Sequence, residues 1–516
     1  MTKIQRRLYM LFFVALFLVT APVLVLFAQG YRFDRIGKIF VYSGSVTVKS
    51  WPREIDLFID GKKKDKKNLN VINNSYTVNG VRPGKHTIRC EKEGYTSWSK
   101  EIEVHSGIST EFWNVVLFPL DNRDLVKYET GQIDQYFISP RDKNEIVFFT
   151  KNDDDTLVSL LNIKEKTVEK IYSTKKFQFL GSTFEENVEW SSDNKRILIP
   201  FSLDGKKNYV IARVKKEDLQ DVINFNDLFD KEINEFSIDK TETLTNNANV
   251  EAEDSTEFEK VRWMFNKNDE LVALTKDYEL FYIDINKPGE KLLIDTQVSG
   301  FDFAENRIYY TQMSNNIVWE IKEDNLDSKR QITNQPIDAP ENTFVKLTVY
   351  DQYRLAIETS KSELFVYNDE KEKKETSMEK ISKKIKGVQF SNDGKKMLYW
   401  TTNEIWCLIL REWKVQPIRQ KGNRIFVTRF SAPVQNVQWM DDYENLLFTV
   451  GNSVKSANID TRWGTHIIDV YSVENNLSNR DILYDKQNQL LFARTKKDQT
   501  HKLQTIQLID KGFFGF

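Results

Sequence analysis

The stretch VQFSNDGKKMLYWTTNEIWCLIL, residues Val388 to Leu410, decides the fold. It holds an apolar strand-like run, a polar turn at Asp393-Gly394, a second run, another short turn and a third run. An Asp-Gly pair between apolar runs is a strong signal of a tight β-hairpin. The stretch therefore predicts consecutive antiparallel strands, and it contains no catalytic motif.

The same order of strand, polar turn and strand recurs eight times, at spacings of roughly 40–50 residues, which are typical of propeller blades. One small sheet cannot bury both of its faces, whereas a ring of stacked sheets can. We therefore expect an all-β chain with a C-terminal β-propeller, with eight blades favoured and seven possible if one unit is degenerate. The units begin at Ile133, Asn187, Lys260, Val298, Phe344, Gly387, Asn436 and Ser478.

The last unit lacks a fourth strand after LQTIQLID, which ends at Asp510. The segment DLVKYETG, residues 124–131, precedes the first unit and could supply the missing strand. Such a closure would join both ends of the ring and remove its exposed strand edges.

The motif FSNDGKKMLY, residues 390–399, resembles the Ser-Pro-Asp-Gly-Lys strand pair of TolB-like propellers, which are similar in form to WD-type propellers. The similarity covers about residues 120–516. It implies a fold and says little about function, because many unrelated proteins share that fold. We interpret the recurring residues as architecture: Asp393 and Gly394 make the turn, and the preceding aromatic residues pack between blades. These aromatic residues are Trp190, Trp263, Phe390 and Trp439.

One spacing breaks the period. Residues 215–259 are acidic and polar, with a predicted short helix around Leu219–Phe229. We interpret this segment as an insertion on a blade loop, disordered in part after Thr241.

Residues 44–119 read as a separate small β-domain. Several of its segments alternate apolar and polar residues, and Asp60-Gly61 and Pro83-Gly84 are turn signals. The segments IDLFIDGKKK and VNGVRPGKHTIRCEKEGYTSWSKEIEV resemble the PEGA domain, although the segment after the first hairpin departs from the family pattern. The resemblance implies a small sandwich that supports or binds, in a surface-exposed bacterial or archaeal protein. The matching residues, for which we expect structural roles, are Asp60, Gly61, Pro83, Gly84, His86, Gly94 and Tyr95.

The N-terminus has the pattern of a membrane anchor. Residues 1–7 are basic, and residues 8–28 are apolar and uncharged, about the length that crosses a bilayer as a helix. The basic residues favour a cytoplasmic N-terminus, although Arg32, Arg35 and Lys38 weaken the bias. A cleaved signal peptide is the alternative, but its apolar region is usually shorter and Pro22 follows Ala21. We expect an uncleaved single-pass anchor with the bulk of the chain outside the cytoplasm.

Composition and motifs limit the function. The net charge of −2 argues against a nucleic-acid partner. Four histidines and two cysteines form no metal-ligand pattern, and no nucleophile elbow or nucleotide-binding glycine motif occurs. The sequence thus offers no catalytic, cofactor-binding or metal-binding residues, and we expect a protein that is not an enzyme.

The expected function is binding. The sequence indicates a scaffold or receptor of the cell envelope, with a lipid bilayer around residues 8–28 and a propeller that engages an envelope protein or a cell-wall polysaccharide. The alternative is a propeller-type glycan hydrolase or lyase, which would need inward carboxylates from different blades about 5–10 Å apart.

Overall fold

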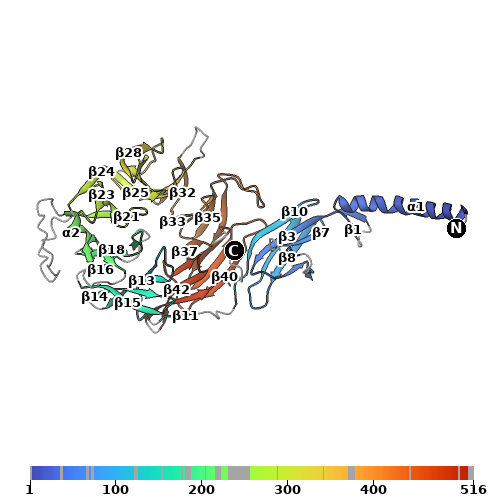
Figure 1. Cartoon of the computed structure of the whole chain (residues 1–516), viewed down its shortest axis with the longest axis horizontal. Helices are drawn as coiled ribbons and strands as arrows, with labels where there is room; N and C mark the ends of the chain where they lie inside the picture. Colours follow the sequence, from blue (N-terminus) through green and yellow to red (C-terminus); the bar gives the residue numbers. More distant parts are fainter. Residues whose placement is uncertain are drawn as a thin grey trace.

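A long apolar helix and two β-domains make up the chain in the computed structural model (Figure 1). The structure describes residues 3–34, 39–65, 69–70, 75–120, 126–128, 130–152, 155–175, 178–180, 188–203, 205–214, 222–230, 256–287, 289–340, 342–369, 378–440, 443–497 and 500–509. The helix lies at one end of the molecule and the larger β-domain at the other, with the small β-domain between them (Figure 1).

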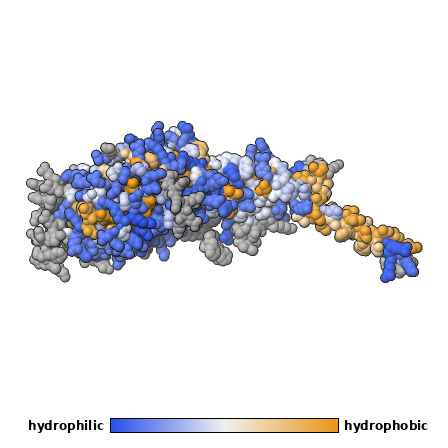
Figure 2. All heavy atoms as spheres, turned by 90° about the horizontal axis from the view of Figure 1, so that it is seen from above, coloured by the Kyte–Doolittle hydropathy of each residue, from blue (hydrophilic) through white to orange (hydrophobic). Residues whose placement is uncertain are grey.

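The helix α1 (Lys3–Ala28) is long and apolar enough to span a membrane. Its 26 residues reach about 39 Å at ~1.5 Å per residue, more than the roughly 30 Å of a bilayer core. No residue of α1 is buried against the protein, and Figure 2 shows it as an apolar rod beside a largely hydrophilic body. A signal sequence near an N-terminus can also meet this criterion of length and composition. A short hairpin of β1 (Tyr31–Asp34) and β2 (Ile39–Tyr42) follows.

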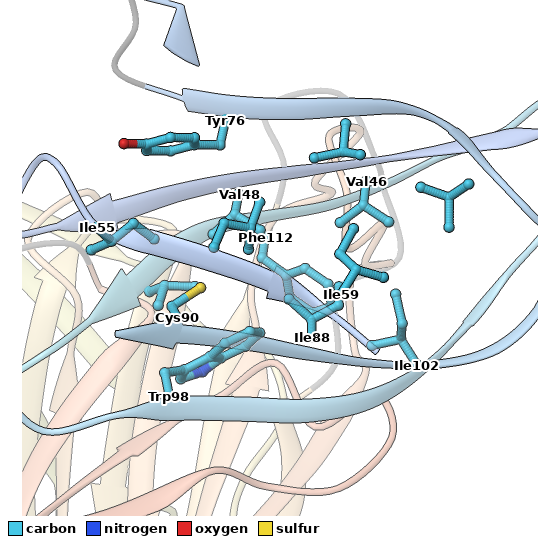
Figure 3. Close-up of a cluster of buried hydrophobic side chains, with 14 of the residues drawn as sticks. Val46, Val48, Ile55, Ile59, Tyr76, Ile88, Cys90, Trp98, Ile102 and Phe112 are labelled. Carbon is cyan, nitrogen blue, oxygen red and sulfur yellow. The ribbon is translucent and has the colours of Figure 1, made fainter. Parts of the chain in front are cut away.

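The small domain consists of two four-stranded sheets packed face to face. Its strands alternate buried and exposed residues, as in β9 (Trp98–Val104), because each sheet has one face on the core and one in solvent. Their side chains fill one core that includes Val48, Ile88, Trp98 and Phe112 (Figure 3). One sheet holds β10 (Ser109–Val116), β3 (Gly44–Trp51), β7 (Ser75–Val81) and β6 (Leu69–Asn70); the other holds β5 (Lys62–Lys63), β4 (Asp56–Ile59), β8 (Gly84–Glu91) and β9 (Trp98–Val104).

The described part of the larger domain forms eight sheets, which we number in chain order. Within each sheet the strands are antiparallel, and most strands pair with the next strand in the chain. The exceptions are β16 and β17, which both pair with β18, and β11, which pairs with β43. Sheet 1 holds β12 (Gln135–Ile138), β13 (Glu145–Asn152), β14 (Asp155–Asn162) and β15 (Thr167–Thr174). Sheet 2 holds β16 (Gln178–Phe179), β17 (Glu189–Trp190), β18 (Arg196–Leu203), β19 (Lys206–Arg213) and β20 (Val222–Asn224). Sheet 3 holds β21 (Phe258–Trp263), β22 (Glu270–Thr275), β23 (Leu280–Asp284) and β24 (Lys291–Asp295), and sheet 4 holds β25 (Val298–Ala304), β26 (Arg307–Gln312), β27 (Val318–Lys322) and β28 (Asn325–Gln331).

The second half of the larger domain repeats this design. Sheet 5 holds β29 (Lys346–Asp351), β30 (Arg354–Glu358), β31 (Glu363–Asn368) and β32 (Met378–Lys383). Sheet 6 holds β33 (Gly387–Phe390), β34 (Lys396–Trp400), β35 (Glu404–Ile409) and β36 (Arg424–Arg429). Sheet 7 holds β37 (Val434–Trp439), β38 (Asn445–Val450), β39 (Ser453–Asn458) and β40 (Ile467–Ser472), and sheet 8 holds β41 (Ile482–Asp485), β42 (Leu490–Lys497), β43 (Thr500–Gln507) and β11 (Val126–Lys127).

The eight sheets form a closed ring. Each of eight apolar clusters is shared by two sheets that follow one another, and one of them joins sheet 8 to sheet 1 through Phe492, Leu503 and Phe148. Backbone pairing also closes the ring, because Val126, which precedes sheet 1 in the chain, pairs with Thr505 in sheet 8. The predicted closure by residues 124–131 is therefore confirmed for the strand β11.

Burial identifies the inside of the ring. We count the strands of each sheet from the centre of the ring outward. A second strand such as β34 is buried throughout, whereas fourth strands such as β24 and β28 are largely exposed and form the outer rim. First strands such as β33 lie at the centre, where their residues line a cavity.

Part of the segment expected as an insertion, about residues 215–259, belongs to the ring instead. Val222–Asn224 is the fourth strand of sheet 2, and β21 starts at Phe258. The helix α2 (Phe225–Asp230) begins later than predicted, and its Phe225 and Phe229 are buried against sheets 2 and 3. The sequence hides this packing because the apolar residues are few and sit among acidic ones. Residues 215–221 and 231–255, including the stretch after Thr241, lie outside the described residues.

Candidate functional site

The first strands are linked around the centre of the ring by a recurring hydrogen bond. In four cases a side chain on one first strand accepts a hydrogen bond from a backbone N–H of the next first strand. The acceptor lies directly before the aromatic position of the repeat. The pairs are Glu189 Oε2 with Trp263 N (3.2 Å), Asp302 Oδ2 with Val349 N (2.8 Å), Gln389 Oε1 with Trp439 N (3.1 Å) and Gln438 Oε1 with Tyr484 N (2.8 Å).

Sheet 3 carries a cation at the equivalent position, Arg262. Its Nε lies 2.6 Å from Glu189 Oε1, and its Nη1 contacts Asp302 Oδ1. Burial alone would lower the pKa of Arg262, but the two carboxylates hold it above its ordinary value. Two first-strand carboxylates from different sheets, Glu189 and Asp302, are therefore engaged by one guanidinium and by backbone N–H groups.

A cavity of about 720 Å³ lies at the centre of the ring and is lined by residues of six of the eight sheets. Its volume falls within the roughly 300–1,000 Å³ typical of ligand sites. The wall comes mainly from the first strands β12, β17, β33, β37 and β41 and from the turns that follow some of them.

The cavity wall is rich in cations and amides. Four cationic residues line the cavity, and one of them, Lys346, pairs with Glu358 (3.2 Å). One acidic residue, Asp485, lines it too, and its carboxylate accepts hydrogen bonds from Gln487 N (3.1 Å) and Asn488 Nδ2 (2.8 Å) within its own turn. Six amide side chains and several aromatic rings complete the wall. The cations are Lys143, Lys346, Arg480 and Lys486, and the amides are Gln389, Asn392, Asn436, Gln438, Asn479 and Gln487.

Two buried polar atoms of cavity-lining residues have no hydrogen-bond partner among the described residues. They are Nε1 of Trp190 and Oδ1 of Asn436, whose residues are 8% and 7% exposed. The amide nitrogen of Asn436 is used, since it donates to Thr449 Oγ1 (2.8 Å) and Ser478 O (2.9 Å). A buried polar group without a partner costs free energy, so such groups at a cavity wall mark places where a ligand can bind.

The predicted repeat residues either pack between sheets or form the turn after the first strand. The indole rings of the repeat are buried in the clusters between sheets, while Phe390 is half-buried at the edge of such a cluster. Asp393 Oδ1 closes the turn by accepting from Ser391 Oγ (2.6 Å) and Lys395 N (3.0 Å), and Gly394 has a φ of +62°. The buried indoles are Trp190, Trp263 and Trp439, of which Trp190 alone also lines the cavity.

The residues that resemble the PEGA motif lie in turns of the small domain. Asp60 has a φ of +52°, and its carboxylate contacts His86 Nδ1 (2.6 Å) and accepts from Thr87 N (3.0 Å). Burial of Asp60 acts to raise its pKa, but the hydrogen bond with His86 and the backbone bond outweigh it and lower the pKa. Gly61 follows at a φ of +72°. These contacts fix the turn between β4 and β5 against β8.

The remaining motif residues also stabilise turns of the small domain. Gly84 starts β8 after Pro83 and has a φ of +127°. Gly94, with a φ of +80°, precedes Tyr95, whose backbone pairs with Pro119 and whose ring packs on the core. None of the seven motif residues lines the central cavity.

The small domain is fixed to sheets 7 and 8 of the ring, and also to the loop between β35 and β36 of sheet 6, where Glu111 N donates to Gln416 Oε1 (3.2 Å). Nζ of the buried Lys100 donates to the carbonyls of Asp460 (2.6 Å) and Arg462 (2.9 Å), and Asn445 Nδ2 donates to Asn114 O (3.0 Å). Apolar contacts continue the joint, since Phe118 belongs to the cluster between sheets 7 and 8. A cavity at this joint measures only about 80 Å³, too small for most ligands.

The polar position before the aromatic residue and the cations of the cavity wall were missed by the sequence analysis. The first had a signal, because Glu189, Arg262, Asp302, Gln389 and Gln438 all stand directly before an aromatic residue. The cations had none, because they come from turns and strand ends of different units.

Comparison with known proteins gives a family match for the small domain. Residues 43–116 match the PEGA domain family. No curated protein matches the chain. Among solved structures, the chain is similar to the C-terminal WD40 domain of Sif2 (8% identity, TM-score 0.46, 74% of this chain and 97% of that one), the propeller of Dos1 (10%, 0.46, 74% and 94%) and the β-propeller domain of Cps50 (Swd1) from Myceliophteria thermophila (10%, 0.37, 74% and 98%). The chain combines a segment that matches the PEGA domain with a larger domain whose own closed ring of four-stranded sheets makes it a β-propeller.

Proposed function

We propose that this protein is a membrane-anchored, extracytoplasmic binding protein of the cell envelope. In this proposal α1 stays in the bilayer, the small domain is a short stalk, and the propeller engages an envelope ligand, either a protein or a cell-wall polysaccharide. The resemblance of the repeat to TolB-like propellers and of residues 43–116 to the PEGA domain is in keeping with a bacterial envelope protein.

The observation that carries the proposal is the central cavity. Its size suits a ligand, and its wall offers cations, amides and aromatic rings from six sheets. The first-strand carboxylates Glu189 and Asp302 are engaged by Arg262, which leaves them in a structural role. We therefore propose binding without catalysis.

The test uses the full chain in lipid nanodiscs with a photo-crosslinking residue in place of Asn392, an exposed residue of the cavity wall. A matched variant carries the same group at Lys164, which is exposed on a turn of sheet 1 and does not line the cavity. Incubation with whole envelope material should give a saturable crosslink from position 392 and none from position 164.

Equal crosslinking from both positions, or none from either, would contradict the proposal. The crosslinked species shows whether the ligand is a protein or a polysaccharide. Incubation of the unmodified protein with purified wall polysaccharide should release no shorter products, and a steady release would instead support the hydrolase or lyase.

A further inference from the structure

The hairpin that follows α1 forms a small sheet of its own. Its strands β1 and β2 pair in register, with Tyr31 opposite Tyr42 and Phe33 opposite Phe40, and they pair with no other described strand. None of the described hairpin residues belongs to the apolar core of the small domain. An isolated two-stranded hairpin is only marginally stable in water, so contact with another surface is needed to hold it.

One face of the hairpin is made of aromatic rings. Alternate residues of a strand point to the same face, and residues paired across two strands share that face. The rings also touch across the strands, since Tyr31 and Tyr42 stack with 5.1 Å between centroids and Phe33 meets Phe40 at 5.4 Å. We call these residues the aromatic face. Its members Phe33, Phe40 and Tyr42 are 51%, 36% and 41% exposed.

The hairpin is fixed to the C-terminal end of α1. The carbonyl of Gly30 accepts from Ser43 N (3.3 Å) and Ser43 Oγ (2.8 Å). Arg32 Nη1 donates to Phe27 O (2.9 Å), and the guanidinium lies 4.5 Å from the centroid of the Phe27 ring. A cation at this end of a helix is favourable, because the helix dipole is negative there. Figure 1 shows β1 beside the end of α1, between the helix and the small domain.

The length of the apolar segment sets the depth of the hairpin. Residues 8–28 rise about 32 Å at ~1.5 Å per residue, close to the roughly 30 Å of a hydrocarbon core. Since α1 ends at Ala28 and β1 begins at Tyr31, a helix across the bilayer places the hairpin in the interfacial layer. Aromatic residues are enriched in that layer. Figure 2 shows apolar surface continuing from α1 to its junction with the body of the protein.

We propose that the β1–β2 hairpin is a second membrane contact, whose aromatic face lies among the lipids at the interface of the bilayer that α1 spans. This inference rests on the anchoring of α1 in the proposed function and adds a lipid-binding surface to it. The free strand edges exclude a deeper position, because backbone groups in the hydrocarbon core need partners inside the protein. Helix and hairpin together fix the height and tilt of the small domain above the membrane.

Accessibility of spin labels tests the proposal, with the full chain in nanodiscs of phosphatidylcholine. A nitroxide is attached to Phe33→Cys or Phe40→Cys, and its collisions with oxygen, which concentrates in lipid, and with a water-soluble nickel chelate are measured by electron paramagnetic resonance. The native Cys90 and Cys407 are buried and give little background.

Two control positions calibrate the scale. Leu24→Cys lies on α1, and Leu292→Cys lies on β24 of the propeller, where Leu292 is 51% exposed, as Phe33 is. The ratio of oxygen to nickel collisions at positions 33 and 40 should be several-fold higher than at position 292 and lower than at position 24.

A second experiment asks whether the rings hold the hairpin in place. A nitroxide at Ile39→Cys, an exposed position of β2, reports on the hairpin without altering the aromatic face. Phe33→Ser with Phe40→Ser should raise its collisions with nickel several-fold. Val168→Ser with Leu292→Ser removes exposed apolar side chains from the propeller instead and should leave them unchanged. Circular dichroism checks that each variant is folded.

The failures can be told apart. If positions 33 and 40 match position 292 while position 24 lies in lipid, the hairpin inference is overturned and the anchor stands. If position 24 is also open to nickel, α1 does not span the bilayer, and the anchor and the hairpin inference both fail. Protection of positions 33 and 40 from both reagents, with dipolar broadening between labels, would show that a second copy covers the aromatic face. No change at position 39 in the double serine variant would likewise overturn the inference. The crosslink from position 392 tests ligand binding separately.

Discussion

The backbone N–H of Trp263 donates a hydrogen bond of 3.2 Å to Oε2 of Glu189 in the neighbouring sheet. Gln389 accepts from the N–H of Trp439 in the same way, at 3.1 Å. The side chain of one repeat thus completes the backbone hydrogen bonding of the next, at the point where each first strand ends. Apolar contacts between the sheets have little directional preference, whereas hydrogen bonds do. These hydrogen bonds therefore help to fix the angle between neighbouring sheets.

Replacement of Glu189 by alanine should destabilise the protein more than replacement of Gln389. Glu189→Ala removes an acceptor and also one of the two partners of Arg262, and it should cost about 2 kcal/mol once partial exposure of the pair is allowed for. Gln389→Ala removes a neutral acceptor and should cost about 1 kcal/mol. Urea unfolding measures both.

Glu189→Gln is the control for the charge, because it keeps an acceptor for Trp263 and loses the ion pair. It should fall between wild type and Glu189→Ala. Equal losses for all three variants would show that these bonds do not hold the sheets in register.

The ring could be predicted because its information is local and repeated. The hairpin signal at Asp393-Gly394 and its relatives in other units each specify two strands, and eight such units leave stacking around an axis as the way to bury both faces. The insertion was placed less well, because Phe225 and Phe229 are isolated apolar residues whose burial depends on sheets 2 and 3 together.

The cavity could not be predicted for a related reason. Lys143, Lys346 and Arg480 come from different sheets and from three different positions in the repeat, so no spacing along the chain connects them. Closure of the ring brings them together. Trp190 shows the limit of pattern reasoning, because the pattern identifies it as core but does not indicate that its N–H lacks a partner.

The two glycines of the predicted turns should differ in their tolerance of alanine. Gly394 has a φ of +62°, and an added Cβ would lie 2.3 Å from Cε1 of Tyr350, whose hydroxyl donates to Asn392 O (2.7 Å). Gly394→Ala should therefore cost about 3 kcal/mol, from the left-handed backbone and the displaced ring. Gly61 has a φ of +72° with nothing within 4 Å of an added Cβ.

Gly61→Ala should accordingly cost only about 1 kcal/mol, the backbone penalty alone. Thermal or urea unfolding of the two variants under identical conditions gives the comparison. Similar losses would mean that the ring of Tyr350 moves aside at little cost, so that the turn in sheet 6 is less constrained than its contacts indicate.

Cysteine labelling on intact cells should reveal the topology that we propose. Lys287→Cys, on an exposed turn of the propeller, should react with a maleimide that does not cross membranes, whereas Lys3→Cys should not. The native thiols give a low background, because Cys90 and Cys407 are fully buried and burial raises the pKa of Cys407 to about 12.

Mass spectrometry of the protein from the same membranes should detect the N-terminal peptide still attached. Labelling of Lys3→Cys would contradict a cytoplasmic N-terminus. Loss of residues 1–28 from the mature protein would show that α1 is a signal sequence, in which case the protein must be held at the envelope by its ligand alone.

Acidification should loosen the joint between the small domain and the ring through His466. This side chain lies beside Trp98 of the small domain, with 5.9 Å between ring centroids. Burial, and then the charge of Lys100, lowers the pKa of His466 to about 4 from its ordinary 6.5. Asp460 stays ionised through most of this range, because its ion pair with Arg462 outweighs burial and lowers its pKa.

The sign of the effect follows from proton binding. Between pH 6.5 and pH 4 the unfolded chain binds a proton at His466 that the folded chain does not, so stability falls as the pH falls through this window. The loss should be on the order of 2 kcal/mol by pH 4, allowing for partial exposure. His466→Gln cannot titrate and should lose less stability over the same range. If the urea midpoints of wild type and His466→Gln fall in parallel from pH 7 to pH 4, protonation of His466 does not control the joint, and other carboxylates must account for any acid sensitivity.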